Sequence, residues 1–315
     1  MNNKLKIVFA GTPEFAVPTF NLLNKSSHEV VCVLTQPDRR SGRGMKINPS
    51  PVKRAAQQCA LYILQPESLD HNVMENLKDL NADILIVAAY GLIIPKSILH
   101  IFPKGCFNVH ASLLPRWRGA APIHRAIESG DPKIGVTIMQ VVEKLDAGPM
   151  AKKVSMDLLE KYTTGDMTEA MALMGAKLMM EVIDVIASGN SINWIEQNES
   201  DVTYAKKIRK DEGILNLNED PSILIKRIKA FNPYPGVKGL FRGKGLKVWN
   251  AVLIDNFDIL KNLQPGDLKV IEKRLILRLD RGGIELMEMQ VEGEKKIEAK
   301  DFIFRYKINQ GDRIN

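Results

Sequence analysis

The sequence predicts an α/β fold, with a mostly parallel sheet covered by helices on both faces, followed by a smaller β-barrel or sandwich domain. Near-continuous apolar runs alternate with helical spacing over the first two thirds of the chain, which is typical of buried parallel strands. Short alternating strands with Gly and Asp turns fill the last third. The charge changes too: residues 1–205 hold 21 basic and 21 acidic residues, and residues 206–315 hold 23 and 16.

Each element of the first part follows from its spacing of apolar residues. Apolar, β-branched segments predict strands within 4–12, 29–36, 82–91, 105–112 and 135–150. Helical spacing predicts helices at 14–26, 51–60 and 73–81, and a long Met-rich amphipathic helix at 164–189. Methionine is a flexible core filler, so we interpret the Met-rich stripe as packing. Gly189 is a suitable C-cap for the long helix.

A polar stretch separates the two parts. Residues 190–209 predict a linker between a first domain at 1–189 and a basic C-terminal domain at 210–315. In the second domain a short helix at 221–231 precedes several strand segments, which lie at 245–254, 274–280, 282–291 and 295–304. The net charge of +7 comes entirely from residues 206–315. This basic part is a candidate nucleic-acid surface, although basic solvated surfaces without a ligand are common.

Composition excludes several protein classes. No apolar run approaches the roughly 20 residues that span a bilayer, and the N-terminal apolar run lacks a small-residue cleavage site, so it predicts a core strand. The three cysteines are scattered without paired spacing, which favours reduced thiols over disulfides or a zinc site. We expect a cytoplasmic protein that binds no metal.

Asn108 and His110 are the first candidate site residues. Residues i and i+2 of a strand point to the same side, so both side chains project together at the carboxyl end of a predicted strand. Ligands of parallel sheets bind beyond such ends. The two residues form either a buried hydrogen-bond pair or the face of an active site. Asp146 follows the next strand in a turn, where it either caps the turn or orients the His110 imidazole.

A basic segment is the second candidate. Residues 35–56 carry Arg39, Arg40, Arg43, Lys46 and Lys53 among Gly, Ser and Pro, a composition in which we expect no helix or strand to persist. At the carboxyl end of a strand, such a loop is well placed to meet phosphates. An ordinary solvated loop is the alternative.

Together these residues resemble a known family. FNVHASLLPRWRGAAPI (107–123) and GVTIMQVVEKLDAGPM (135–150) are similar to the 10-formyltetrahydrofolate-dependent formyltransferases, and Asn108, His110 and Asp146 match their catalytic triad in order and spacing. The segments FAGTPEFAVP, LTQPDRRSGRGMKINPSPVK and FNPYPG resemble the members that formylate methionyl initiator tRNA. The resemblance covers nearly the whole chain in order.

The resemblance implies a Rossmann-like catalytic domain and an OB-like C-terminal barrel that binds tRNA. The formyl group of 10-formyltetrahydrofolate, a co-substrate, would pass to the α-amino group of methionyl initiator tRNA. Formyl-folate binding is assigned to Ser112, Leu113, Leu114 and Pro115. We expect tRNA contacts from Arg39, Arg40, Arg43, Lys46, Lys206, Lys207, Arg209 and Lys210.

In the implied reaction Asn108 and His110 donate hydrogen bonds to a developing oxyanion, and Asp146 orients His110 and helps to move a proton. No metal or covalent intermediate is required. We expect a monomer that does not bind membranes. Two alternatives stay open: the same transfer to a small amine, such as glycinamide ribonucleotide or an amino sugar nucleotide, and a non-catalytic RNA-binding protein. The basic loop and domain favour tRNA, and the Asn-His-Asp set favours an enzyme.

Overall fold

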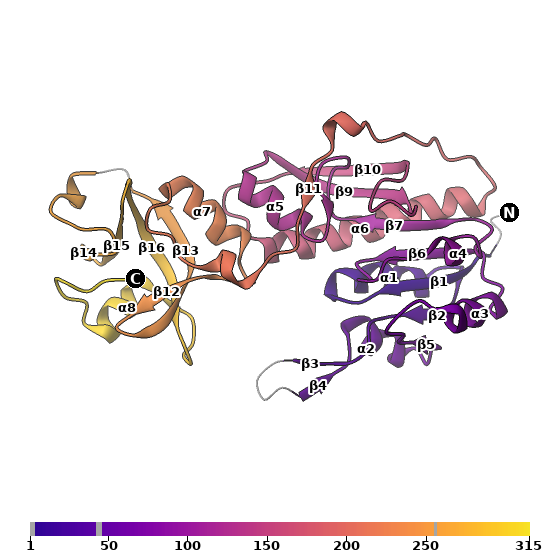
Figure 1. The fold of residues 1–315 in the computed structure, drawn as a ribbon, viewed down its shortest axis with the longest axis horizontal. Coiled ribbons are helices and arrows are strands. Elements are labelled where there is room, and N and C mark those ends of the chain that lie inside the picture. Colours follow the sequence, from indigo (N-terminus) through magenta and orange to yellow (C-terminus); the bar gives the residue numbers. More distant parts are fainter. Residues whose placement is uncertain (1–3, 42–45, 255–256) are drawn as a thin grey trace. The chain divides into compact units, whose positions relative to one another are not determined.

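The computed structural model describes residues 4–41, 46–254 and 257–315. By their contacts these residues form two compact units (Figure 1). The first unit contains the chain up to Pro122, Lys133–Asp157 and Thr168–Ala205. The second contains Ile123–Pro132, Leu158–Met167 and the chain from Lys206 onward. The domain boundaries that the sequence suggests, at 189 and 210, stay predictions.

The first unit is built on a mostly parallel sheet. Its strand order is β10–β9–β7–β6–β1–β2–β5, in which β9 pairs antiparallel with both β7 and β10. The strands are β1 (Lys6–Gly11), β2 (Glu29–Leu34), β5 (Ile63–Leu64), β6 (Ile84–Ala88), β7 (Cys106–His110), β9 (Lys133–Gln140) and β10 (Met150–Asp157). The helices before residue 205 are η1 (Glu14–Ala16), α1 (Val17–Lys25), α2 (Pro51–Gln58), α3 (His71–Asp79), α4 (Lys96–Leu99), α5 (Pro122–Ser129), α6 (Thr164–Ala187) and η2 (Glu199–Asp201). Of these, α5 belongs to the second unit apart from Pro122.

Helices cover both faces of this sheet because its strands alternate apolar residues on each side. On one face, α3 and α4 contribute Leu77 and Ile98 to a buried cluster that includes Cys106 of β7. On the other face, α1 packs on β1, and α6 lies close to β7. The approach of α6 requires Gly175, since a Cβ there would lie 2.5 Å from a methyl group of Val109. Asn108 and His110 therefore share the face opposite α6.

The second unit is an antiparallel sheet with the order β12–β13–β16–β15–β14, and β17 pairs with β16. Its elements are η3 (Lys210–Gly213), α7 (Pro221–Ala230), β12 (Val237–Phe241), β13 (Lys244–Leu253), η4 (Phe257–Leu260), β14 (Leu268–Ile271), β15 (Arg274–Leu279), β16 (Gly282–Val291), β17 (Ile297–Glu298) and α8 (Ala299–Tyr306). Residues 312–315 bond to the backbone of Leu240 in β12 and of Leu268 in β14. This terminal segment joins the two sides of the sheet, which gives it a barrel-like closure.

The structure confirms the predicted fold class, an α/β unit followed by a smaller β unit, and the long helix near 164–189. Two expectations are wrong. Residues 295–304, expected as a strand, are mostly helical: only β17 (Ile297–Glu298) pairs with β16, and α8 covers Ala299–Tyr306. An acidic residue in the first turn of α8, Asp301, and a basic one in its last turn, Arg305, favour the helix. Within the basic segment, β3 (Arg39–Ser41) and β4 (Lys46–Asn48) pair antiparallel. The strand preference of a segment depends strongly on its cross-strand neighbours, so the composition of these residues did not reveal the pairing. Two further short strands, β8 (Arg118–Gly119) and β11 (Tyr204–Ala205), pair in parallel.

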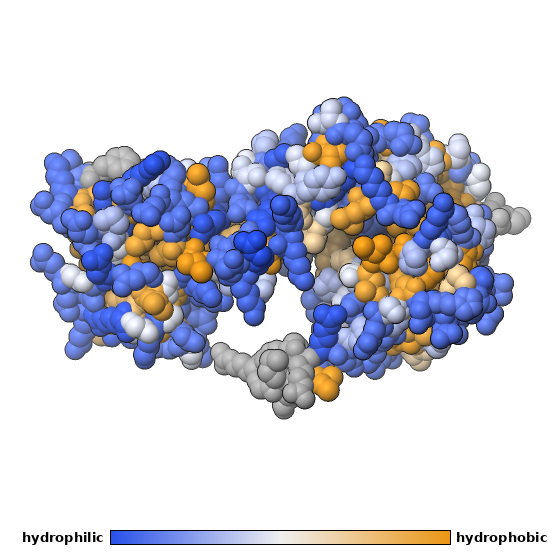
Figure 2. All heavy atoms as spheres, in the orientation of Figure 1, coloured by the Kyte–Doolittle hydropathy of each residue, from blue (hydrophilic) through white to orange (hydrophobic). Residues whose placement is uncertain are grey.

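Hydrophilic side chains cover most of the face that Figure 2 shows, in both units. None of the helices in the described ranges combines the length and apolar character that a membrane crossing needs.

Candidate active site

Strand β7 presents Asn108 and His110 on one face of the sheet. The strand is fixed on both sides, since Asn108 pairs with Val87 of β6 and with Met139 of β9. His110 is only 5% exposed, and Asn108 is partly buried. In the described part of the chain the Asn108 amide makes no hydrogen bond. Its N–H groups are therefore available to a ligand.

Both ring nitrogens of His110 face oxygen atoms. Nε2 lies 3.0 Å from the backbone oxygen of Trp117, and a carbonyl only accepts, so Nε2 carries the proton of this bond. Nδ1 lies 3.7 Å from Oδ2 of Asp146, an ion-pair distance that is too long for a hydrogen bond. The ring is thus oriented as a proton donor, with a carboxylate beside its other nitrogen.

Asp146 lies beside His110, a contact that the sequence left open. The direction of β9 determines how the chain brings the two residues together. Because β9 runs antiparallel to β7, it ends at Gln140, beside Phe107. Phe107 and His110 are three residues apart, or about 10 Å along the strand. Residues 141–149 must therefore return toward His110, and Asp146 lies on this returning loop.

Two other segments hold the returning loop in place. The N–H of Gly119, in β8, donates to Oδ2 of Asp146 at 2.8 Å. The side-chain Nε2 of Gln197 donates to the backbone oxygens of Asp146 and Gly148, both at 2.8 Å. Sequence reasoning missed both residues. Gly119 acts through its backbone, which no side-chain pattern marks, and Gln197 lies in the stretch that we predicted as a linker.

The segment predicted to bind formyl-folate, residues 112–115, follows β7 directly. Thr137 of β9 donates to the Ser112 carbonyl at 2.7 Å and accepts from the Leu114 N–H at 3.2 Å. Lys153 donates to the Leu114 carbonyl at 2.8 Å. Ser112 and Leu114 are buried, whereas Leu113 and Pro115 are partly exposed. These bonds fix the shape of the segment next to His110.

The predicted tRNA-binding residues fall into two groups. In the first unit, Arg39 begins β3 and donates to Gln36 at 2.9 Å. Arg43 lies outside the described residues, and only the backbone pairing of Arg40 and Lys46 in the hairpin is described.

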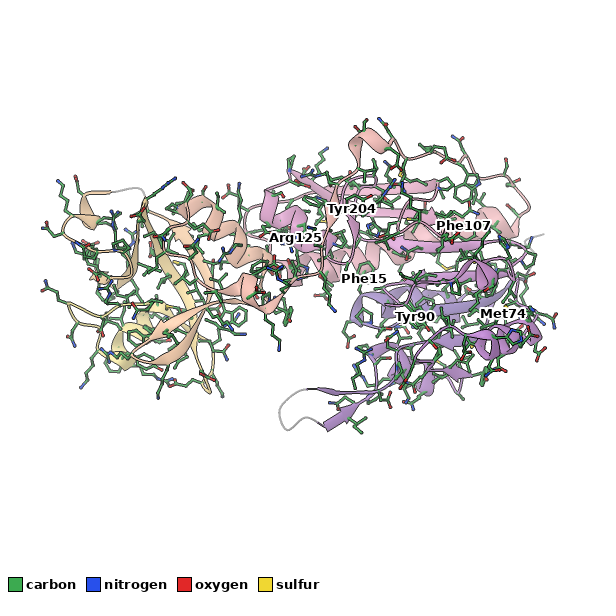
Figure 3. The ribbon with its side chains drawn as sticks, viewed as in Figure 1. Phe15, Met74, Tyr90, Phe107, Arg125 and Tyr204 are labelled. Carbon is green, nitrogen blue, oxygen red and sulfur yellow. The ribbon has the colours of Figure 1, made fainter. Side chains whose placement is uncertain are left out.

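The second group is exposed in the second unit, and consists of Lys206, Lys207, Arg209 and Lys210. Arg125 of α5 holds the start of this run, since its guanidinium donates to the Lys206 carbonyl and pairs with Glu212 at 2.8 Å. Figure 3 labels Arg125 and, in the first unit, Phe107 and Tyr204.

Two other kinds of site, a metal centre and a cysteine nucleophile, find little support among the described residues. Among the described residues no three His, Cys, Asp or Glu side chains gather as metal ligands. Cys106 lies on β7 two residues before Asn108, but burial raises the pKa of its thiol to about 12. A thiol with that pKa stays protonated near neutral pH and is a poor nucleophile.

Both parts of the chain match known proteins. Residues 5–183 match the formyl transferase family, and residues 207–307 match the formyl transferase C-terminal domain. A methionyl-tRNA formyltransferase from Methylobacillus flagellatus is 41% identical over 98% of this chain and 99% of its own length. One from Coxiella burnetii is 44% identical over 95% of each chain.

Solved structures share the fold at low identity. HypX from Aquifex aeolicus in complex with tetrahydrofolic acid has a TM-score of 0.66 at 14% identity, covering 99% of this chain and 51% of its own. An N-formyltransferase from Helicobacter canadensis, in complex with folinic acid and dTDP-3-aminofucose, has a TM-score of 0.65 at 17% identity, covering 90% and 98%. The two family matches and the full-length relatives show that the chain belongs to the methionyl-tRNA formyltransferase family.

Proposed function

We propose that this chain transfers the formyl group of 10-formyltetrahydrofolate to the α-amino group of methionyl initiator tRNA, for translation initiation. The observation that carries the proposal is the arrangement of Asn108, His110 and Asp146 beside β7. Relatives named methionyl-tRNA formyltransferase match the chain over nearly its whole length, which supports this choice of acceptor.

In the proposed reaction the neutral α-amine attacks the formyl carbon, and the formyl oxygen becomes an oxyanion. The Asn108 amide donates one hydrogen bond to it. His110 donates a second when the oxyanion replaces the Trp117 carbonyl as the acceptor of the Nε2 proton. Removal of one such donor typically costs on the order of 3–4 kcal/mol of transition-state stabilisation.

Proton transfer completes the reaction. The attacking amine loses a proton, and N10 of the folate gains one as its bond to the formyl carbon breaks. Asp146, beside Nδ1 of His110, takes up the proton from the amine, through a water where needed, and the same proton then passes to N10, which restores the carboxylate. Its carboxylate also keeps the His110 ring in the orientation that the oxyanion requires.

We place formyl-folate against residues 112–115. Leu113 and Pro115 are partly exposed and can touch the ligand, whereas the buried Ser112 and Leu114 keep the loop in shape. We therefore assign two of the four predicted residues to contact with folate and the other two to support of the loop.

We place tRNA phosphates on the β3–β4 ladder and on the exposed side chains of Lys206, Lys207, Arg209 and Lys210. Residues 206–315 also carry the whole net charge of the chain, +7, which supports binding that depends on salt but not on base sequence. We further propose a cytoplasmic monomer. The three cysteines are free thiols, as expected in a reducing compartment, and light scattering of the purified chain would measure its oligomeric state.

The first experiment supplies 10-formyltetrahydrofolate with Met-charged initiator tRNA, and glycinamide ribonucleotide and an amino sugar nucleotide in parallel. The readout is the blocked amine. Formylation of tRNA alone supports the proposal. Formylation of a small amine alone would keep the roles of Asn108, His110 and Asp146 but overturn the tRNA roles of the basic residues. Binding of tRNA without transfer to any acceptor would favour an RNA-binding protein.

A further inference from the structure

The backbone of Asp146 has a conformation that needs support. Its φ is +48°, in the left-handed region that residues other than glycine rarely adopt. Such conformations persist only where the surroundings impose them, and they gather at functional sites. Asp146 also lies on the loop 141–149, which begins beside Phe107 and returns toward His110. Some contact must therefore hold the loop against β7.

Gln197 supplies that contact. Its Nε2 donates to the backbone oxygens of Asp146 and Gly148, so it fixes the carbonyl of the residue with positive φ and the chain that follows it. Its Oε1 accepts a hydrogen bond from Nε of Arg118 at 2.9 Å. Because carbonyls only accept and the guanidinium only donates, these partners fix which way the amide faces. The Gln197 side chain is also buried, with 8% of its surface exposed.

Arg118 links this contact to the carboxylate. The Arg118 side chain is fully buried and pairs with Glu199 at 2.9 Å. The next residue, Gly119, donates its N–H to the Oδ2 atom of Asp146 that faces His110. A side chain at Gly119 would not fit, since a Cβ would lie 2.8 Å from the Ala205 carbonyl oxygen.

The segment that carries Gln197 is itself fixed to the first unit. Trp194 stacks on Phe107 at the start of β7, with ring centroids 5.8 Å apart. Ile195 pairs with Met150 of β10. After Gln197, strand β11 pairs with β8. Gln197 therefore acts from a fixed position between two backbone anchors.

We infer that Gln197 and Arg118 are positioning residues for formyl transfer, and that they hold the Asp146 backbone and carboxylate in register with His110. This inference rests on the proposed function for its kinetic consequence. Neither side chain contacts His110 or Asn108 among the described bonds, so their effect passes through Asp146. Displacement of a reacting group by about 1 Å can cost about 100-fold in rate.

The test compares Gln197→Met with Gln290→Met. Methionine keeps the length of glutamine without its amide. Gln290, in the second unit, resembles Gln197 in that its amide both accepts and donates: it accepts from Trp249 Nε1 at 3.0 Å and donates to the Glu294 carbonyl at 2.8 Å. We expect Gln197→Met to lower kcat by about 10- to 100-fold, with KM for both substrates within about twofold of wild type. Gln290→Met should leave kcat unchanged.

A second readout requires no activity. The Gly119 amide signal in an NMR spectrum of ¹⁵N-labelled protein reports the hydrogen bond to Asp146. We expect it to move in Gln197→Met and to stay in place in Gln290→Met. Gln197→Glu keeps the length of glutamine but turns a carboxylate oxygen toward two carbonyls, so it should behave like Gln197→Met.

The inference is overturned if the Gly119 signal does not move, or if it moves while kcat stays at the wild-type value. Loss of kcat together with equally weakened tRNA and folate KM would also overturn it, because that result indicates general damage. Should Gln197→Met not fold, Gln197→Asn, with an amide one methylene shorter, is read in the same way. Failure of the wild-type chain to formylate tRNA would refute the proposed function, and the Gly119 signal alone would then decide the inference.

Discussion

Replacing Asn108 by alanine should slow formyl transfer strongly while changing the stability of the folded protein little. In the described part of the chain the Asn108 amide has no hydrogen-bond partner, so the substitution breaks no bond of the free protein. We therefore expect the free energy of unfolding to change by less than about 1 kcal/mol. A donor to the oxyanion, in contrast, is worth about 3–4 kcal/mol, or a factor of about 100 to 1,000 in kcat.

The assay is single-turnover formylation of Met-charged initiator tRNA, with both substrates saturating. Asn24→Ala is the matched control, since Asn24 lies in the same unit and, within the described ranges, its amide makes one hydrogen bond, to the Cys59 sulfur at 3.2 Å. The control should keep the wild-type rate. A rate for Asn108→Ala within about threefold of wild type would refute the oxyanion role. A raised KM with normal kcat would instead assign Asn108 to ground-state binding.

Three further predictions test other parts of the molecule. Lys207→Ala should weaken tRNA binding and reduce the slope of log affinity against log salt by about 1; an unchanged slope would contradict a phosphate contact. Gly135→Ala would place a Cβ 2.1 Å from the Val154 carbonyl oxygen, so a urea titration should show a loss of about 1–3 kcal/mol in unfolding free energy, and an unchanged midpoint would count against the tight β9–β10 pairing. Iodoacetamide at about pH 8, where ordinary thiols react, should alkylate Cys59 alone. Cys59 is exposed, whereas burial raises the pKa of the Cys32 and Cys106 thiols to about 12. More than one modified thiol in mass spectrometry would contradict this.

The alternation of apolar runs and helical spacing was sufficient to predict the fold class, because buried parallel strands and their covering helices leave strong local signals. The shared face of Asn108 and His110 also followed from the period of two along a strand. The short ladder between β3 and β4 did not, since it depends on cross-strand pairing and not on the strand preference of its residues.

The contact between Asp146 and His110 was beyond the reach of local patterns. The reversed direction of β9 decides where the loop after it begins, and pairing direction is a property of the whole sheet. Likewise, a single glutamine in a polar stretch carries no signal of its bonds to Asp146 and Gly148. The spacing of residues in a sequence identifies those that share a helix or strand. A side chain that bonds to backbone carbonyls places no requirement on the residue types that carry them, so the sequence pattern does not reveal the contact.

The closure of the second unit by residues 312–315 has a consequence for how this unit meets other chains. A sheet edge with unpaired N–H and C=O groups is a template for aggregation. Here Leu215 and Asn315 bond to the outer side of β12, and Asp312 and Ile314 bond to Leu268 and Gly266 at the start of β14. Part of each edge is therefore occupied within the chain, which leaves fewer free N–H and C=O groups for self-association into β-structure.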